Sequence, residues 1–386
     1  MNRPRFNPLP PVSSPSRALS GWRARLASDP IPRLLREGSP SVLARIRRDL
    51  IDDSEAPGLD EVWGYPEVKA LVKKIEKDGS FAPKAPEKAL GPLDFATALS
   101  TLRGLDRLAD LGVRAGEGGE PGKDGAPAKP AKPPKELLKS VDFLLSSQAS
   151  DGGLAALAIT DSPKVPAKMP ALHFQGWAIS ALCRVGFETD PRVEKGLQFL
   201  IERRQDDGGW AWRGVRTDSA ARPSSHLITG MVLRAFAASG ARRASREARR
   251  AAELLATRFL QPDRYPDRKA PSYWEILTEP RFYTDVLDAL DTVTAIGLGK
   301  ENSGVRTAEA YLRSRQAIDG LWYPGPPLNK AEALAAAAIS KADAGKKAAG
   351  RDGKDAKDPK DKESGKETDA AIALTLRVLV VLRRIN

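Results

Sequence analysis

The sequence predicts an all-α fold, a closed or nearly closed barrel of helical hairpins. Three observations predict it: an Asp-Gly turn recurs at a regular spacing, an amphipathic helix precedes each turn, and a helix that is apolar nearly all round follows it. A helix that is apolar on every side must be buried on every side, whereas an amphipathic helix needs cover on one side only. The alternation therefore predicts an inner ring of buried helices inside an outer ring of half-buried ones.

The repeat is visible as a shared register around the Asp-Gly turn. Gly152 and Gly208 are 56 residues apart, and Gly208 and Gly320 are 112 apart, which is twice that interval. A degenerate copy without the glycine lies midway, at 259–265. The four clearest copies are ALVKKIEKDGSF (70–81), FLLSSQASDGGL (143–154), FLIERRQDDGGW (199–210) and YLRSRQAIDGLW (311–322).

Each expected helix carries its own boundary signals. Asp190 and Pro191 supply an N-cap and a first-turn proline for an outer helix whose apolar face includes Val193, Leu197 and Leu200. The expected inner helices cover 177–185, 227–238 and 286–296. Glycines suited to a left-handed helix cap follow the inner helices, at Gly112, Gly186, Gly240 and Gly297.

Composition excludes several classes of protein. The chain has 386 residues, a formal net charge of +12, one cysteine (Cys183) and two histidines. It therefore has no intramolecular disulfide framework, no CxxC motif and no HExxH zinc site. Arg377 interrupts the longest apolar tract, 370–382, and the first residues lack the apolar run of a secretory signal. We expect a cytoplasmic protein, peripheral to the membrane if it meets one.

Charge and low complexity divide the chain. The first 50 residues hold ten arginines and three acidic residues, so we expect a basic, partly disordered arm at 1–36, with an anionic membrane surface as its candidate partner. The arm lacks interleaved aromatic residues, so nucleic acid is not expected as a partner. The barrel is expected to be a single domain over 37–386, with disordered low-complexity insertions at 115–135 and 341–369.

The pattern [FY]L-x3-Q-x3-G-x-W in these copies resembles the QW repeat of the squalene and oxidosqualene cyclases, and its DGGW core is similar to protein prenyltransferase β subunits. The resemblance spans about 60–385 and implies an (α/α)6 toroid. It also implies that the Gln, Gly and Trp of the motif are structural. The residues assigned to packing on this basis are Gln148, Gly152, Gly208, Trp210, Gln316, Gly320 and Trp322.

The catalytic motifs of such enzymes are missing. The chain has no DxDD motif, and Asp52-Asp53 fails DDxxD because Ala56 stands at the last position. The nearest candidates for a proton-donating acid are Asp285 and Asp288, which are three residues apart and so close on one helix face. Whether the protein is an enzyme stays open. No cofactor and no metal site is predicted, and zinc or magnesium has no supporting motif.

The loops ahead of the inner helices are expected to form one mouth of the barrel. Arginine and aromatic side chains there suit a ligand with an anionic head and an apolar tail. The sequence leaves three functions open. The first is a terpenoid-cyclase- or prenyltransferase-like protein that binds a polyisoprenoid or similar lipid and, if it is catalytic, transforms it. The others are a non-catalytic toroid scaffold or binding protein, and a carbohydrate-active lyase or hydrolase. A protein partner is unknown. The candidate ligand-binding residues are His173, Trp177, Trp212, Arg213, Arg216, His226, Tyr273, Trp274, Tyr283 and Tyr323.

Overall fold

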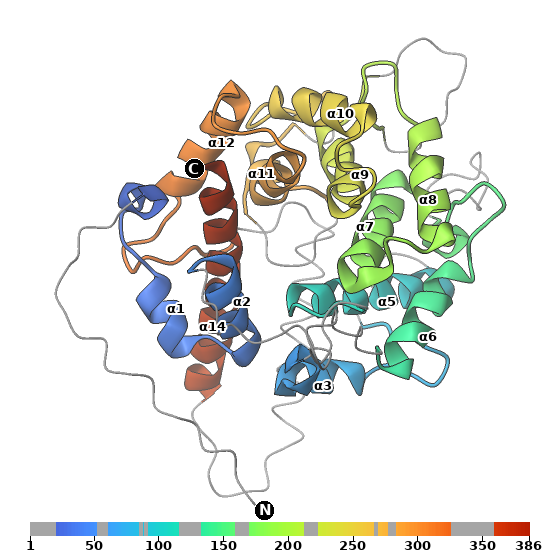
Figure 1. Ribbon diagram of the computed structural model, residues 1–386, viewed down its shortest axis with the longest axis horizontal. Helices are drawn as coiled ribbons and strands as arrows, with labels where there is room; N and C mark the ends of the chain where they lie inside the picture. Colours follow the sequence, from blue (N-terminus) through green and yellow to red (C-terminus); the bar gives the residue numbers. More distant parts are fainter. Residues whose placement is uncertain are drawn as a thin grey trace, which may run out of the picture.

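The protein folds as a set of packed helices in the computed structural model (Figure 1). The structure describes residues 21–51, 61–84, 88, 92–115, 133–158, 170–211, 223–265, 269–276, 283–325 and 359–386, the side chains of the last segment only from 368. Helices and turns make up this part of the chain, and isolated bridges such as Ile75–Phe81 are its only extended pairings. The all-α class predicted from the sequence is confirmed.

Two kinds of helix alternate along the chain. Every residue of α7 (Leu172–Leu182) is buried, and so is nearly every residue of α9 (His226–Ala238) and α11 (Val286–Ala295). The helices between them, α8 (Pro191–Glu202), α10 (Arg246–Ala256) and α12 (Ser303–Ser314), bury one face each. The sequence places the start of α8 correctly, and Asp190 caps it by accepting from the Arg192 amide. It also places α9 and α11 within one residue of these bounds, but α7 begins at Leu172, five residues before the predicted start at 177.

The remaining helices continue this arrangement at both ends of the chain. Leu93–Asp110 (α5) packs on α7 and on α6 (Lys135–Leu145), and α3 (Pro66–Val72) packs on α5. At the C-terminus, α14 (Pro359–Ile385) lies between α11 and the N-terminal pair α1 (Ile31–Glu37) and α2 (Pro40–Asp49) (Figure 1). Residues 21–36 of the expected arm thus form η1 (Gly21–Arg25) and α1, and α14 begins inside the expected second insertion. None of the described helices has both the length and the apolar character of a membrane span.

The Asp-Gly turns share one hydrogen-bond pattern. In each, the aspartate carboxylate accepts from the amide two residues on, at 3.0 to 3.2 Å. The residue after that turn donates its amide to a polar side chain on the next buried helix: Trp210 to Thr229 at 2.9 Å, and Trp322 to Thr375 at 2.9 Å. The indole of each tryptophan donates to a carbonyl ten residues earlier, at 2.7 Å. The motif therefore ties a half-buried helix to the buried helix that follows it.

Glycine geometry agrees with the expected caps at three of four positions. Gly112, Gly186 and Gly297 have φ of 91°, 97° and 105°, the left-handed region. The prediction for Gly240 is wrong. Helix α9 ends at Ala238, the cap residue Ser239 is extended, and the Gly240 amide donates to the Glu188 carboxylate at 2.7 Å. A side-chain acceptor on a neighbouring segment replaces the left-handed cap there.

We expect Gly152→Ala to lower the free energy of unfolding by more than 2 kcal/mol. Gly152 has φ of 97°, and a Cβ there would lie 2.4 Å from the Lys195 carbonyl oxygen, so strain and a backbone clash add. Gly297→Ala is the matched control, because it has the same left-handed backbone with nothing within 4 Å. Urea denaturation measures both, and an equal loss at the two positions contradicts the close approach.

Candidate functional site

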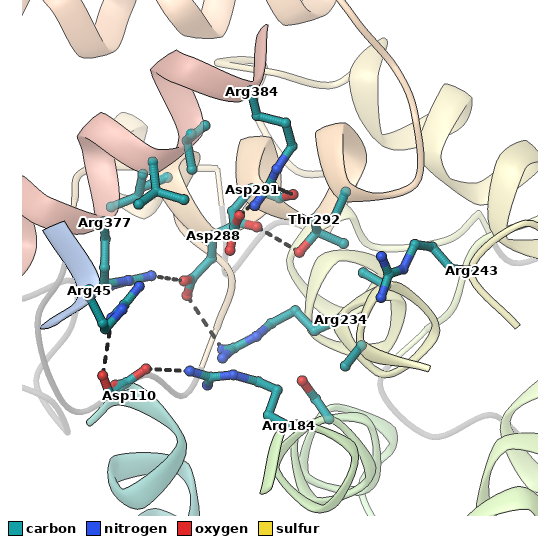
Figure 2. Close-up of a pocket in the computed structure, with 17 residues that line it drawn as sticks. Arg45, Asp110, Arg184, Arg234, Arg243, Asp288, Asp291, Thr292, Arg377 and Arg384 are labelled. Carbon is teal, nitrogen blue, oxygen red and sulfur yellow. Dashed lines mark hydrogen bonds and ion pairs between the residues drawn. The ribbon is translucent and has the colours of Figure 1, made fainter. Parts of the chain in front are cut away.

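A cavity of about 290 Å³ lies where the buried helices converge (Figure 2). Helices α2, α5, α7, α9, α11 and α14, or the residues directly after them, all contribute to its wall. Its volume is at the lower end of small-molecule sites. The charged residues of the wall are Arg45, Asp110, Arg184, Arg234, Arg243, Asp288, Asp291, Arg377 and Arg384, and the rest are mainly small or aliphatic, such as Ala237, Ala238, Ala295 and Val381.

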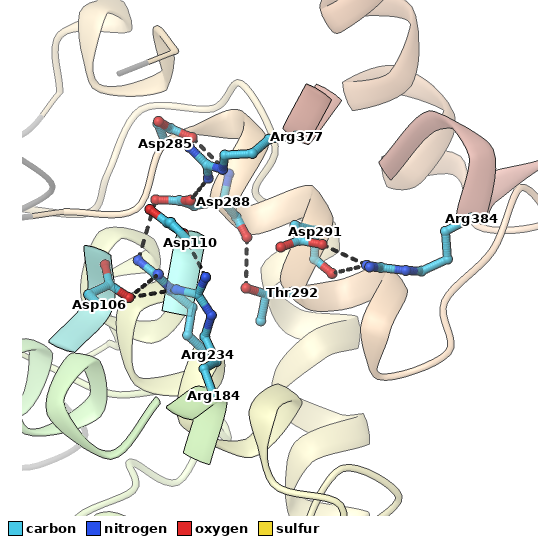
Figure 3. A network of polar contacts seen from close by, with 10 residues as sticks. All are labelled: Asp106, Asp110, Arg184, Arg234, Asp285, Asp288, Asp291, Thr292, Arg377 and Arg384. Carbon is cyan, nitrogen blue, oxygen red and sulfur yellow. Dashed lines mark hydrogen bonds and ion pairs between the residues drawn. The ribbon is translucent and has the colours of Figure 1, made fainter. Parts of the chain in front are cut away.

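The deep part of the cavity is an arginine–aspartate network (Figure 3). Arg184 contacts Asp106 and Asp110 at 2.6 Å each. Asp288 accepts from Arg377 of α14 and lies 3.6 Å from Arg234 of α9. The Asp288 side chain is only 2% exposed. Three arginines and three aspartates therefore balance in charge here, and we call Asp106, Asp110, Arg184, Arg234, Asp288 and Arg377 the deep tier.

The outer part of the cavity carries an excess of positive charge. Arg384 contacts Asp291 at 2.6 Å, and Arg45 contacts Asp49 at 3.4 Å. Arg243, which is exposed, has no ion-pair partner within the described part of the chain. A second hollow continues from this point and shares Arg45 and Arg384 with the first. Four arginines face two aspartates, and we call Arg45, Asp49, Arg243, Asp291, Arg383 and Arg384 the rim.

Arg234 is the least satisfied of the buried cations in the cavity wall. Its side chain is 9% exposed, and its two aspartate neighbours lie at 3.6 and 3.7 Å, beyond hydrogen-bond distance. Among the described residues, its Nη1 atom has no hydrogen-bond partner. A buried guanidinium donor without an acceptor costs free energy, so this position favours an acceptor from outside the chain.

Positive charge is also crowded at Arg45. Burial lowers the pKa of Arg45. The nearby Arg184 and Arg48 also lower it, whereas Asp49 and Asp110 raise it. Arginine keeps its proton in proteins, so the guanidinium stays charged at an electrostatic cost. An anion at the rim relieves that cost.

The two predicted acids have different surroundings. Asp285 caps α11, and its carboxylate accepts from the Asp288 amide at 2.8 Å. Asp288 lies one turn on, in the cavity wall, with two guanidinium groups beside it. Neighbouring positive charge favours an ionised carboxylate. The proton-donor role assigned to Asp285 and Asp288 stays a prediction, and the observed contacts are those of a cap and an ion pair.

Several predicted ligand-binding residues lie together, away from the arginine cavity. His173 at the start of α7 stacks on Tyr283 with ring centroids 5.9 Å apart, and Tyr283 meets Tyr273 edge to face at 5.9 Å. Trp177 is buried one turn along α7, stacked on Phe174. The structure thus brings His173, Tyr273 and Tyr283 together at the N-terminal ends of the buried helices. None of these residues lines the cavity described above.

His226 has a separate environment. Its ring stacks on Trp274 with centroids 4.5 Å apart, and its Nδ1 atom lies 3.3 Å from the Asp263 carboxylate. Asp263 belongs to the degenerate repeat and also accepts from the Ser225 hydroxyl at 2.7 Å. Burial lowers the pKa of His226 to about 4, although Asp263 acts in the opposite direction. His226 is therefore neutral at pH 7.

This pKa predicts an acid-sensitive contribution to stability. The unfolded histidine titrates near 6.5, so between about 6.5 and 4 the unfolded state binds a proton that the folded state does not. We expect His226 to cost the fold about 3 kcal/mol as pH falls from 7 to 4. His226→Gln should flatten this part of the profile in urea denaturation at several pH values. An unchanged slope contradicts the buried neutral histidine.

Other predicted residues are surface residues or fall outside the described segments. Tyr323 is 37% exposed and donates its hydroxyl to Asp319 at 2.7 Å. Trp212, Arg213 and Arg216 lie outside the described residues. In the part of the chain that is described, no group of three or more His, Cys, Asp or Glu side chains could hold a metal ion. Burial raises the pKa of Cys183 to about 12, so its thiol is protonated at neutral pH.

The arginine cavity was not predicted from the sequence. Arg377 was identified there only as an interruption of an apolar tract. The available signal was that Arg184, Arg234 and Arg377 each stand alone among apolar residues of a buried helix, in LCRVGF, MVLRAF and LTLRVL. A charged residue in an all-round buried helix must meet a partner, so three such residues indicate a shared polar site.

Comparison with known proteins gives likenesses to solved structures, two of which follow. No family model matches the chain, and no curated protein matches it. The structure is similar to that of a protein from Actinoplanes, at 16% identity and a TM-score of 0.28, over 85% of this chain and 98% of that one. It is also similar to a variant type II terpene cyclase from Scytonema in complex with its substrate geranylgeranyl dihydroxybenzoate, at 12% identity and a TM-score of 0.28, over 84% and 97%. These values assign neither a family nor a ligand to this chain.

Proposed function

We propose that the protein is an (α/α)6 toroid that binds a compact anionic ligand in its central cavity. In this arrangement α2, α5, α7, α9, α11 and α14 form the inner ring, and α1, α3, α6, α8, α10 and α12 form the outer ring. Contacts across the two chain ends support closure of the ring. Gln316 donates to the Ser28 carbonyl at 2.7 Å ahead of α1, as Gln148 donates to the Arg192 carbonyl at 2.8 Å on α8.

The observation that carries the binding function is the excess of positive charge at the rim. Four arginines there face two aspartates, and Arg243 has no ion-pair partner among the described residues. Arginine is the side chain best suited to phosphate and carboxylate oxygens, because its planar fork can donate two parallel hydrogen bonds.

Cavity size and lining support anion binding over polyisoprenoid binding. A volume of about 290 Å³ with a largely charged wall accommodates an anionic head group but is too small for a long polyisoprenoid chain. The absence of DxDD and DDxxD motifs from the sequence favours binding over cyclisation or ionisation chemistry. The alternative function is a scaffold with no ligand. In such a scaffold the arginines serve only to join the helices and neutralise their C-termini.

Isothermal titration calorimetry with inorganic phosphate, diphosphate and geranylgeranyl diphosphate tests this function. We expect phosphate and diphosphate to bind, and Arg243→Gln/Arg384→Gln to weaken both at least tenfold, because these rim arginines supply the excess charge. Geranylgeranyl diphosphate should bind no tighter than diphosphate.

Arg246→Gln is the matched control, because Arg246 is exposed on α10 and is not part of the cavity wall. It should leave every Kd within about twofold. If the titrations with all three anions give only heats of dilution, the scaffold is favoured instead. If geranylgeranyl diphosphate binds much more tightly than diphosphate, the lipid-binding function is favoured.

A further inference from the structure

We propose that the cavity selects a phosphorylated polyol or sugar, with the phosphate at the rim and a hydroxyl group between Arg234 and Asp288. This inference rests on the proposed anion-binding function and adds to it the class and the orientation of the ligand. It follows from the charge difference between the two tiers, from their separation, and from the geometry of the Arg234–Asp288 pair.

Charge places the anionic group at the rim. The three arginines of the deep tier are matched by three aspartates, so a phosphate there would meet carboxylates as often as guanidinium groups. The rim has four arginines for two aspartates, and Arg243 there has no ion-pair partner among the described residues. A phosphate dianion compensates the excess of two charges at the rim.

The Arg234–Asp288 pair is suited to a hydroxyl group. The Nη1 and Oδ2 atoms are 3.6 Å apart, too far for a hydrogen bond between them, and both side chains are at least nine-tenths buried. A hydroxyl accepts one hydrogen bond and donates another, so a single ligand hydroxyl can accept from Arg234 and donate to Asp288. A second anion in this position would be repelled by the Asp288 carboxylate.

Spacing and size set the length of the ligand. Arg377 of the deep tier and Arg384 of the rim are seven residues apart on α14, about 10 Å along the helix axis. Inorganic phosphate reaches one tier only, whereas a phosphorylated sugar reaches both. The small side chains of Ala237, Ala238 and Ala295 in the cavity wall leave room for the carbon skeleton.

Calorimetry with inorganic phosphate, glucose 6-phosphate and free glucose tests the orientation. In the wild-type protein we expect glucose 6-phosphate to bind at least tenfold tighter than phosphate. Arg234→Lys keeps the charge but removes the Nη1 donor, and it should abolish that gain while leaving the phosphate Kd within about twofold. Ala237→Leu, three residues along α9 and in the same wall, should abolish the gain by filling the cavity.

The outcomes separate the two proposals. If Arg234→Lys weakens inorganic phosphate as much as glucose 6-phosphate, the anion lies in the deep tier and the orientation is overturned, while anion binding stands. A sugar phosphate that binds no tighter than phosphate overturns the ligand class. If neither phosphate compound binds the wild-type protein, the proposed function fails, and the inference with it.

Discussion

Replacing Asp288 by asparagine should lower the free energy of unfolding by about 3–5 kcal/mol. The substitution removes the carboxylate that pairs with Arg377 and faces Arg234, and it leaves two arginines, 15% and 9% exposed, without their shared counter-charge. Loss of one partner from a buried ion pair is this costly because the remaining charge stays desolvated. Urea denaturation at pH 7 measures the change.

Two neighbours on the same helix are matched controls. Asp285→Asn keeps an N-cap residue and should cost less than about 1 kcal/mol, because asparagine caps helices as well as aspartate does. Asp291→Asn removes an ion pair whose side chains are 48% and 36% exposed and should also cost less than about 1 kcal/mol. Equal losses at all three positions would show that Asp288 has no special ion-pair role. If the protein has a catalytic activity and the Asp285→Asn and Asp288→Asn variants retain it, these residues are not catalytic acids.

Replacing Trp210 by alanine should cost about 3–5 kcal/mol. The Trp210 side chain is fully buried, it packs on Phe236 of α9, and its indole donates to the Leu200 carbonyl of α8 at 2.7 Å. Removing it leaves a cavity between α8 and α9 and an unsatisfied carbonyl. The drop in the urea midpoint, at unchanged slope, measures the loss.

Tyr323→Ala separates this structural role from a general effect of losing an aromatic residue. Tyr323 is 37% exposed, so its loss should change the free energy of unfolding by less than about 1 kcal/mol. Trp210→Phe should fall between the two, because it restores most of the volume but not the N–H donor. A Trp210→Ala protein as stable as Tyr323→Ala would mean that the motif does not hold the helices together.

The all-α class was predictable because its signals are local. Asp190 and Pro191 mark the start of α8, and the Asp-Gly turns repeat the same bonds at each copy. The left-handed cap predicted at Gly240 was wrong because the acceptor for its amide, Glu188, lies 52 residues away, and no local pattern encodes such a contact.

The cavity was harder to predict because its residues are distant in the chain. Arg45, Asp110 and Arg384 come together only through the packing of α2, α5 and α14, and each is unremarkable in its own segment. The sequence drew attention instead to aromatic residues near helix N-termini, where His173 and Tyr283 do meet. Periodicity predicts which helices are buried, but not which charged residues of those helices face one another.

Anion binding in the central cavity is tested most directly by a crystal structure of the protein soaked with arsenate, a phosphate analogue that scatters anomalously. We expect one strong anomalous peak in the cavity, within hydrogen-bond distance of Arg243 and Arg384 at the rim. The same peak should be missing from the Arg243→Gln/Arg384→Gln protein. A wild-type cavity filled only by water, with the six arginines engaged by aspartates and helix C-termini alone, would contradict ligand binding and leave the cavity a structural joint.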